Sequence, residues 1–167
     1  MIQVLRILGI DPGLTATGWA VIEVRGFQIS ALTSGVIKSS PATPLARRLG
    51  DLYDALSEVM QDYQPDEVAV EETFVNQNPA SALKLGHARG IALAAPARLG
   101  LPVYEYAPNQ IKKSLVGVGH ADKKQVQHMV SLLLPGAQFK TADAADAFAI
   151  AICHTHNRPT SRTGALA

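Results

Sequence analysis

Cysteine and long apolar runs are scarce in this 167-residue chain, and each shortage excludes a class of protein. A single cysteine, Cys153, cannot build an internal disulfide framework, and it fits a reducing compartment. No apolar stretch approaches the run of about 20 residues that a membrane-spanning helix needs. The first apolar run leads directly into Asp11 and Pro12, which is unlike a cleavable signal peptide. We therefore expect a cytoplasmic protein that is not associated with a membrane.

The net charge of +1 conceals an uneven distribution of charge along the chain. Residues 1–78 carry five Lys/Arg and ten Asp/Glu, whereas residues 79–167 carry ten Lys/Arg and four Asp/Glu. A basic segment beside a carboxylate-bearing segment could grip a phosphate backbone and also hold metal ligands. A solvated basic surface is the commoner meaning of such an imbalance, so charge alone does not identify a nucleic-acid partner.

Apolar runs separated by turn signals predict one α/β domain over residues 1–157. The expected strands are 3–10, 19–24, 27–38, 67–74 and 101–107, with a hairpin turn at Arg25-Gly26. Helices are expected from Pro44 with Thr43 as its N-cap, over 79–99, from Pro108, over 121–134 and after Thr141. The polar tail, 158–167, is expected to be disordered.

This order of elements predicts a mixed five-stranded sheet with a hairpin at one edge and helices on both faces. Ribonuclease-H-like domains have the same order. The sequence contains no internal repeat and no second domain.

Four acidic residues stand where the pattern predicts an apolar core, and burial of an unpaired carboxylate is costly. Asp11 ends the first strand, and Glu71 interrupts the fourth. Asp143 and Asp146 lie one helical turn apart on a helix whose other residues, from 142 to 153, are Ala, Phe, Ile and Cys. The helix dipole also explains an acid in the first turn, such as Asp143, but it explains Asp146 less well. Two like charges so placed repel each other unless a cation lies near them.

If these segments converge, their carboxylates form a cluster of hard oxygen ligands. Such sites suit Mg²⁺ or Mn²⁺, whereas zinc prefers His or Cys. Two ions about 3.5–4 Å apart can activate a water molecule and stabilise the leaving oxygen of a phosphodiester. We expect two ions in the site, with Asp11 as their shared ligand and with Glu71, Asp143 and Asp146 completing the two sites.

Four segments in order resemble the RuvC family of Holliday-junction resolvases, and the resemblance runs from about residue 5 to residue 156. The segments are LGIDPGLTATGWAVIE, VAVEETFVNQNPASALKLGHARG, YEYAPNQIKKSLVGVGHADKKQVQHMV and DAADAFAIAICH. GIDPG by itself is a weak signal, but all four in order are highly specific. The resemblance implies a metal-dependent endonuclease that resolves four-way DNA junctions during recombination and repair.

The resemblance also assigns roles to single residues. The family's four catalytic acids correspond to Asp11, Glu71, Asp143 and Asp146. Two lysines that help to hold the scissile phosphate correspond to Lys112 and Lys123, although the adjacent Lys113 and Lys124 leave that assignment open. Phe74 corresponds to an aromatic residue that stacks on unpaired bases at the crossover; without the resemblance we would assign Phe74 to the core.

The family is homodimeric, and a two-fold dimer matches the approximate two-fold symmetry of a four-way junction. Small residues such as Gly86 and Gly90 make helix 79–99 the candidate dimer face, although packing on its own sheet explains them equally well. We expect Lys84 and Arg89, which interrupt this run, on the DNA-facing or outer side of the helix. The resemblance further implies the branch-migration complex RuvAB as a partner.

Two other functional classes share parts of this pattern. Actin-like ATPases and sugar kinases also begin with a Gly-Ile-Asp strand, but they need a second lobe and a second glycine-rich phosphate loop. Here the only later candidate, residues 117–121, follows a predicted helix rather than a strand. A catalytically inactive junction-binding protein would keep the basic half and lose one or more of the acids, yet all four are present. ATP binding would favour the first alternative, and junction binding without cleavage the second.

Overall fold

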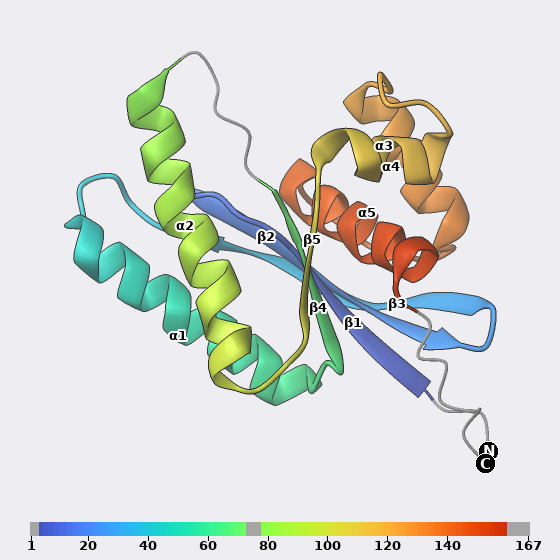
Figure 1. The fold of residues 1–167 in the computed structure, drawn as a ribbon, viewed down its shortest axis with the longest axis horizontal. Coiled ribbons are helices and arrows are strands. Elements are labelled where there is room, and N and C mark those ends of the chain that lie inside the picture. The colour runs from blue at the N-terminus through green and yellow to red at the C-terminus, as the bar shows by residue number, and fades with distance from the viewer. Residues whose placement is uncertain (1–3, 73–77, 160–167) are drawn as a thin grey trace.

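The computed structural model describes residues 4–72 and 78–159, and a five-stranded mixed sheet forms its centre (Figure 1). The strands lie in the order β3-β2-β1-β4-β5. Antiparallel pairing joins β1 to β2 and β2 to β3, whereas β4 runs parallel to β1 and β5 parallel to β4. Their bounds are β1 Val4–Asp11, β2 Ala16–Arg25, β3 Gln28–Lys38, β4 Glu67–Glu71 and β5 Val103–Tyr106. The predicted mixed sheet with a hairpin at one edge is confirmed.

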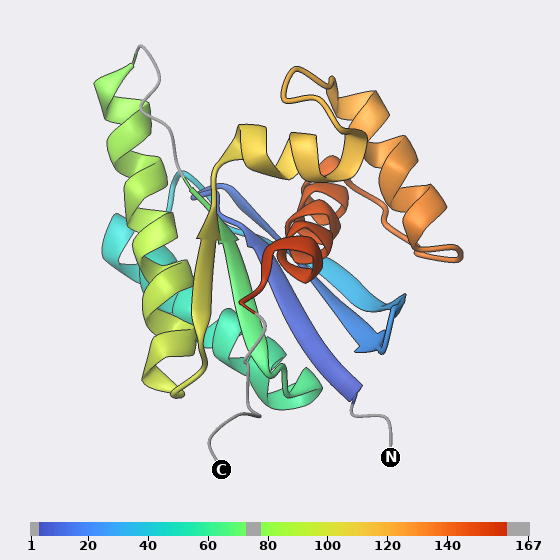
Figure 2. The ribbon, with the colours of Figure 1, turned by 45° about the vertical axis from the view of Figure 1, so that its right-hand side comes forward.

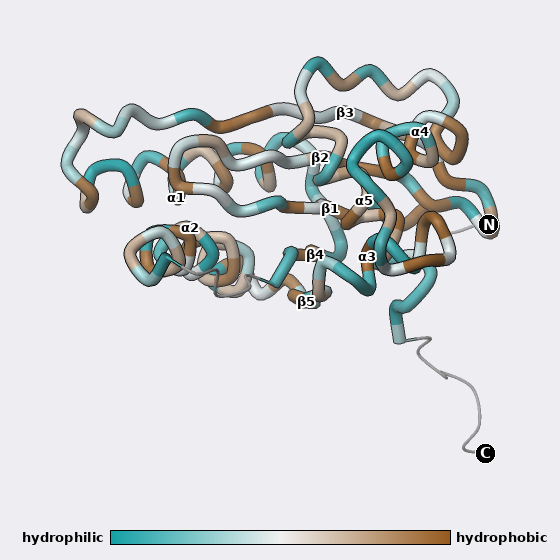
Figure 3. The backbone as a smooth tube through the Cα atoms, turned by 90° about the horizontal axis from the view of Figure 1, so that it is seen from above, coloured by the Kyte–Doolittle hydropathy of each residue, from teal (hydrophilic) through white to brown (hydrophobic). Residues whose placement is uncertain are grey.

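Helices cover both faces of this sheet, as the sequence predicts. One face packs on α1 and α2 through Leu8, Val21 and Val68, whereas the other packs on α3, α4 and α5 through Ile7, Ile22 and Ala69. Figure 3 shows the strands stacked between these two groups of helices, and Figure 2 shows α3 and α4 lying beyond α5. The bounds are α1 Leu45–Tyr63, α2 Pro79–Arg98, α3 Pro108–Val116, α4 Lys123–Leu133 and α5 Ala142–Asn157.

The start of α1 differs by one residue from the prediction. Pro44 occupies the N-cap position with extended backbone angles, and no side chain caps the helix. Thr43 is therefore not the N-cap, and its backbone N–H donates to the carbonyl of Ser40 within the preceding turn. Proline is well suited to this position because its ring holds φ near the observed −55°. Its missing N–H costs nothing there, since the first N–H groups of a helix have no intrahelical partner.

Two glycines let α5 lie directly on the sheet. A Cβ atom at Gly9 would stand 2.1 Å from the carbonyl oxygen of Ala147, and one at Gly18 would stand 2.1 Å from the carbonyl oxygen of Asp143. Any larger residue would therefore push the helix away from β1 and β2. The close approach fixes the N-terminal turn of α5 beside the C-terminal end of β1, because Asp11 pairs with Gly18 across the two strands.

The C-terminal helix and the residue directly after it both contact the body of the domain. Cys153 is buried in α5 and carries a free thiol, as the apolar sequence around it predicts. Arg158, the first residue of the predicted tail, is held by an ion pair with Glu67, and residues 160–167 lie outside the described residues. Within the described ranges, no helix has both the length and the apolar character that a membrane crossing requires.

Candidate active site

The C-terminal ends of two neighbouring parallel strands bring the first two acids together. Ile10 of β1 pairs with Val70 of β4, so Asp11 and Glu71 are the next residues along the two strands. Side chains alternate between the faces of a strand, and Gly9 and Ala69, two residues earlier, face α5. Asp11 and Glu71 therefore project on the face that α5 covers, at the end of the sheet where β1 and β4 terminate (Figure 1).

The first turns of α5 supply the other two acids. Thr141 is the N-cap, and its hydroxyl accepts a hydrogen bond from the backbone N–H of Ala144, as the sequence predicts. Asp143 and Asp146 follow at a spacing of three residues, on one face of the helix. Because Gly18 holds the backbone of Asp143 against β2 beside Asp11, both helical acids lie at the same end of the sheet as Asp11 and Glu71.

Burial and mutual repulsion perturb the titration of these acids. Burial, together with the negative charges of Glu71, Asp146 and Asp143, raises the pKa of Asp11 to about 8. Burial also raises the pKa of Glu71, and the charge of Asp146 adds to that increase. A hydrogen bond joins Asp11 to Glu71 and favours ionisation of Glu71 while it disfavours ionisation of Asp11. These two carboxyl groups therefore share a proton at neutral pH, which marks a strongly electronegative site.

Two lysines lie beside the acids and partly offset their charge. Burial raises the pKa of Asp146, and the charge of Lys123, whose Nζ lies 3.5 Å from Asp146 Oδ2, limits that increase. Lys112, on α3, lowers the pKa of both Glu71 and Asp146 through its charge. The adjacent Lys113 lines a different surface cavity. The structure thus places Lys112 and Lys123 at the acids, which favours them over their neighbours as phosphate ligands.

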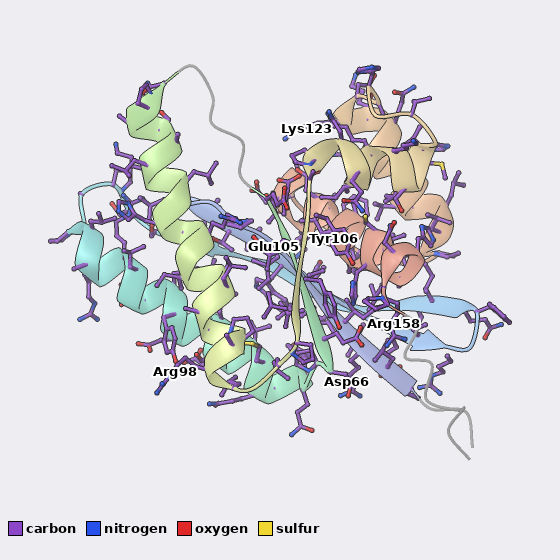
Figure 4. All side chains as sticks on the ribbon, viewed as in Figure 1. Asp66, Arg98, Glu105, Tyr106, Lys123 and Arg158 are labelled. Carbon is purple, nitrogen blue, oxygen red and sulfur yellow. The ribbon has the colours of Figure 1, made fainter. Side chains whose placement is uncertain are left out.

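A cavity of about 280 Å³ opens at this cluster. Its walls combine three acids and both lysines with an apolar side: Asp11, Glu71, Pro108, Ile111, Lys112, Lys123, Val126, Asp146 and Ala149. Asp143 is not part of the wall and acts on the other acids from the edge of the site. Figure 4 shows Lys123 at this end of the molecule, among carboxylate oxygens at the top of β4.

The donor atoms suit a hard divalent cation, although they do not yet form a closed cage. In the part of the chain from 4 to 72 and from 78 to 159, no three His, Cys, Asp or Glu side chains are already grouped for metal binding. The acids are instead close neighbours whose repulsion raises the pKa of Asp11. Oxygen-only donors with excess negative charge fit Mg²⁺ or Mn²⁺, because these ions prefer carboxylate ligands.

A buried threonine that the sequence analysis did not identify orders the loop after Asp11. Thr17 is fully buried, and its hydroxyl donates to the carbonyl of Gly13 at 2.7 Å and accepts from the N–H of Gly13 at 3.2 Å. This double contact closes the turn between β1 and β2 and so fixes the backbone from which Asp11 projects. The spacing of Gly13 and Thr17 in DPGLTATG was the available signal, since hydroxyl side chains commonly close such turns.

The other predicted DNA contacts have different outcomes. Phe74 lies outside the described residues. Lys84 is exposed on the N-terminal half of α2, at the same end of the sheet as the acids (Figure 1). Arg89 forms an ion pair with Glu105 on β5 and keeps 32% of its side chain exposed, and its contact with DNA stays a prediction. Glu105 lies on β5, the edge strand of the sheet, and Arg89 on the facing helix α2 neutralises its charge. The sequence around Arg89 could not reveal this partner.

Known proteins share both the sequence and the fold. The chain matches the family model for crossover junction endodeoxyribonuclease RuvC over residues 7–154. It is 56% identical over 158 residues to the enzyme of that name from Allorhizobium ampelinum, covering 95% of this chain and 94% of the relative. For the Rhizobium meliloti enzyme the identity is 55% over 169 residues, covering 100% and 99%. A solved structure, T. thermophilus RuvC in complex with Holliday junction substrate, is 38% identical with a TM-score of 0.84, covering 90% and 93%. The chain therefore belongs to the RuvC family of crossover junction endodeoxyribonucleases.

Proposed function

We propose that this protein resolves four-way DNA junctions by metal-dependent hydrolysis of one phosphodiester bond in each of two strands of like polarity. One observation carries the proposal: Asp11, Glu71 and Asp146 line a single cavity with Lys112 and Lys123. Membership of the family supports the chemistry, and the similar protein solved with a Holliday junction supports the substrate. The two products would be nicked duplexes that a ligase can seal.

Asp11, Glu71, Asp143 and Asp146 would hold the metal, which we propose to be two Mg²⁺ or Mn²⁺ ions. When bound, such ions supply an activated water molecule and stabilise the oxygen that leaves the phosphorus. The proton shared by Asp11 and Glu71 must depart before both carboxylates can act as ligands. Metal affinity and cleavage should therefore rise with pH up to about 8, the pKa of Asp11.

Lys112 and Lys123 would hold the scissile phosphate at the mouth of the acid cluster. A phosphodiester brings a further negative charge to a site that already repels anions, so cations at the wall lower the cost of its approach. Lys123 sits opposite Asp146 and can exchange that partner for a phosphate oxygen, because its side chain is 75% exposed. An ammonium group is a point charge on a flexible stem, which suits this exchange.

The active unit would be a homodimer that uses the outer face of α2. Gly86 and Gly90 are exposed, and a Cβ at either position would meet no atom of residues 4–72 or 78–159 within 4 Å. Among these residues their small size therefore serves no packing, and α2 packs on the domain through Ala88 and Ala92. Leu83, which is 67% exposed, adds apolar area to the same helix. Small residues on an outer helical face allow a second backbone to approach closely.

The remaining contacts complete the proposal. Phe74 would stack on bases that unpair at the crossover, and Lys84 would contact the phosphate backbone near the site. Arg89 could do so only by releasing Glu105. The branch-migration complex RuvAB would be the partner that delivers the junction.

A cleavage assay with synthetic DNA tests this function. Purified protein is incubated with a four-way junction, and with linear duplexes that carry the same sequences, in the presence of Mg²⁺, Mn²⁺ or a chelator. The proposal predicts metal-dependent nicks in the junction, placed symmetrically on two strands, and little cleavage of the duplexes. Glu71→Gln should abolish the nicks, while Glu58→Gln, at an exposed acid of α1, should not. Tight binding without any cleavage would instead support the catalytically inactive alternative.

A further inference from the structure

A second, partly buried polar cluster surrounds His154, near the C-terminal end of α5. His154 is fully buried. Its Nδ1 lies 2.6 Å from the hydroxyl of Tyr106 on β5, and its Nε2 lies 2.7 Å from Oε2 of Glu67 on β4. Arg158 donates to the other oxygen of Glu67 at 2.6 Å. Figure 4 shows Arg158 at the end of α5 away from Lys123, with Tyr106 between them. Nothing in the proposed chemistry uses these four residues.

The hydrogen bonds in this cluster have defined directions. Burial opposes ionisation of Glu67, but hydrogen bonds from Arg158 and His154 outweigh it and lower the pKa of this carboxyl group. Burial lowers the pKa of His154, so its imidazole is neutral at pH 7. An ionised carboxylate only accepts, so Nε2–H of His154 donates to Glu67 and Nδ1 accepts from the hydroxyl of Tyr106. Both nitrogens of the imidazole are thereby satisfied.

Glu67 with His154, and Glu71 with Asp146, stand toward the two ends of the same pair of elements, β4 and α5. Along β4, Glu67 and Glu71 face α5 and stand four residues apart, or about 13 Å. Along α5, which runs in the opposite direction, His154 and Asp146 stand eight residues apart, or about 12 Å. The matching lengths allow His154 to bind Glu67 at one end while Asp146 faces Glu71 at the other.

These two ends exert opposite forces on α5. At the active site Asp146 and Glu71 line one cavity, and two carboxylates so placed repel each other unless a cation lies near them. At the far end the contacts of Glu67 with His154 and Arg158 are attractive. Between them Gly9 of β1 receives the backbone of Ala147 and Ala151, which holds α5 close to the sheet. The hydrogen bonds of His154 add directional contacts at the C-terminal end of the helix.

We infer that His154 is a positioning residue that fixes the rotation and axial position of α5, and so sets where Asp143 and Asp146 stand relative to Asp11 and Glu71. This inference rests on the proposed function, because it concerns the geometry of that metal site. A carboxylate about 6 Å from the helix axis moves by about 1 Å when the helix rotates by 10°. Functional constellations need their groups within about 0.5 Å. A small rotation of α5 would therefore weaken metal binding without unfolding the protein.

Two substitutions at His154 separate positioning from simple stability. His154→Leu keeps the bulk of the side chain and removes both hydrogen bonds. His154→Gln keeps an N–H that can reach Glu67. Leu56→Ala is the matched control, because Leu56 is fully buried in α1 on the other face of the sheet and its truncation destabilises the fold without touching α5.

The readouts are the Mn²⁺ concentration that half-saturates the folded protein in a calorimetric titration, and the Mn²⁺ concentration that gives half-maximal cleavage of a four-way junction. His154→Leu should raise both by about tenfold, the lower end of the effect of removing groups that orient metal ligands. His154→Gln should stay within about twofold of the wild type. Leu56→Ala should lower the unfolding temperature and leave both concentrations unchanged.

If both Mn²⁺ concentrations are the same in His154→Leu and the wild type, the inference is overturned and the cluster has a purely stabilising role. If His154→Leu does not fold, Tyr106→Phe decides, since it removes one hydroxyl and keeps the ring; an unchanged half-saturation there overturns the inference too. Failure of the proposed function has a different signature. In that case the wild type itself would show neither Mn²⁺ binding nor cleavage.

Discussion

Asp11→Asn should make the metal-free protein more stable at neutral pH while it removes activity. The pKa of Asp11 is about 8 in the folded protein and 3.8 as its ordinary value. The folded protein therefore holds a proton that the unfolded chain releases between these values. This contribution to stability is fully present below about pH 4 and is lost as the pH rises through about 8. Asparagine has no such proton to lose.

The magnitude depends on the number of protons. A difference of one bound proton changes the free energy of unfolding by about 1.4 kcal/mol per pH unit. Between pH 5 and pH 7 the wild type should lose up to about 3 kcal/mol from Asp11. Between pH 5 and pH 7 the free energy of unfolding of Asp11→Asn should fall by about 3 kcal/mol less than that of the wild type. Urea unfolding at pH 5, 6 and 7 in the presence of a chelator measures both curves.

Asp54→Asn provides the matched control, because Asp54 is an exposed acid of α1 and lies outside the active site. It should reproduce the pH dependence of the wild type. Saturating Mn²⁺ should restore stability to the wild type at pH 7, since metal replaces the proton, and should do so much less in Asp11→Asn. Parallel pH curves for the wild type and Asp11→Asn would refute the account of a strained, electronegative site.

Three further substitutions test separate parts of the structure. Lys123→Ala should slow cleavage and lower the salt dependence of junction binding by about one unit of slope. Lys124→Ala, at the exposed neighbouring lysine, should change cleavage little. Equal effects of the two substitutions would contradict the assignment of Lys123 as the phosphate ligand. Gly18→Ala should lower both the unfolding temperature and the rate of cleavage, because its Cβ would stand 2.1 Å from a carbonyl oxygen of α5. Gly90→Ala, where a Cβ meets none of the described residues, should leave the unfolding temperature and the rate unchanged. A fully active Gly18→Ala would contradict the close packing of α5. Gly86→Leu should give a folded monomer in sedimentation that cuts a cruciform plasmid without pairing its nicks; a dimer with paired nicks would place the interface elsewhere.

The convergence of the acids could be predicted from the sequence because they violate the apolar pattern around them. Asp11 and Glu71 interrupt strands whose neighbours are buried, and alternation then determines the face on which they project. Asp146 is a full turn inside a helix of apolar residues, where a solvated acid is not expected. Lys112 could be separated from Lys113 only in the structure, because both lie on α3 and the direction of each depends on how that helix packs.

The features that the sequence did not reveal depend on partners from distant segments. Glu67 looks like an ordinary first residue of a strand, and His154 looks like a basic residue in the last turn of a helix, which the helix dipole favours. Only their convergence in space makes a buried hydrogen-bonded pair. The ion pair of Arg89 with Glu105 was missed for the same reason, since Glu105 lies on another element. The N-cap of α1 was misassigned by one residue because both Thr43 and Pro44 are plausible near a helix start.

The central claim is that the acids of this site perform the cleavage and do not hold the fold or the DNA. The most direct measurement compares junction binding and junction cleavage in Asp143→Asn and Asp146→Asn, with binding measured in a chelator and cleavage in Mn²⁺. Asparagine is nearly isosteric with aspartate and removes an anion beside the DNA. We predict wild-type or tighter binding together with loss of cleavage. A folded variant that loses binding in parallel with cleavage, or one that still cuts the junction, would contradict the account.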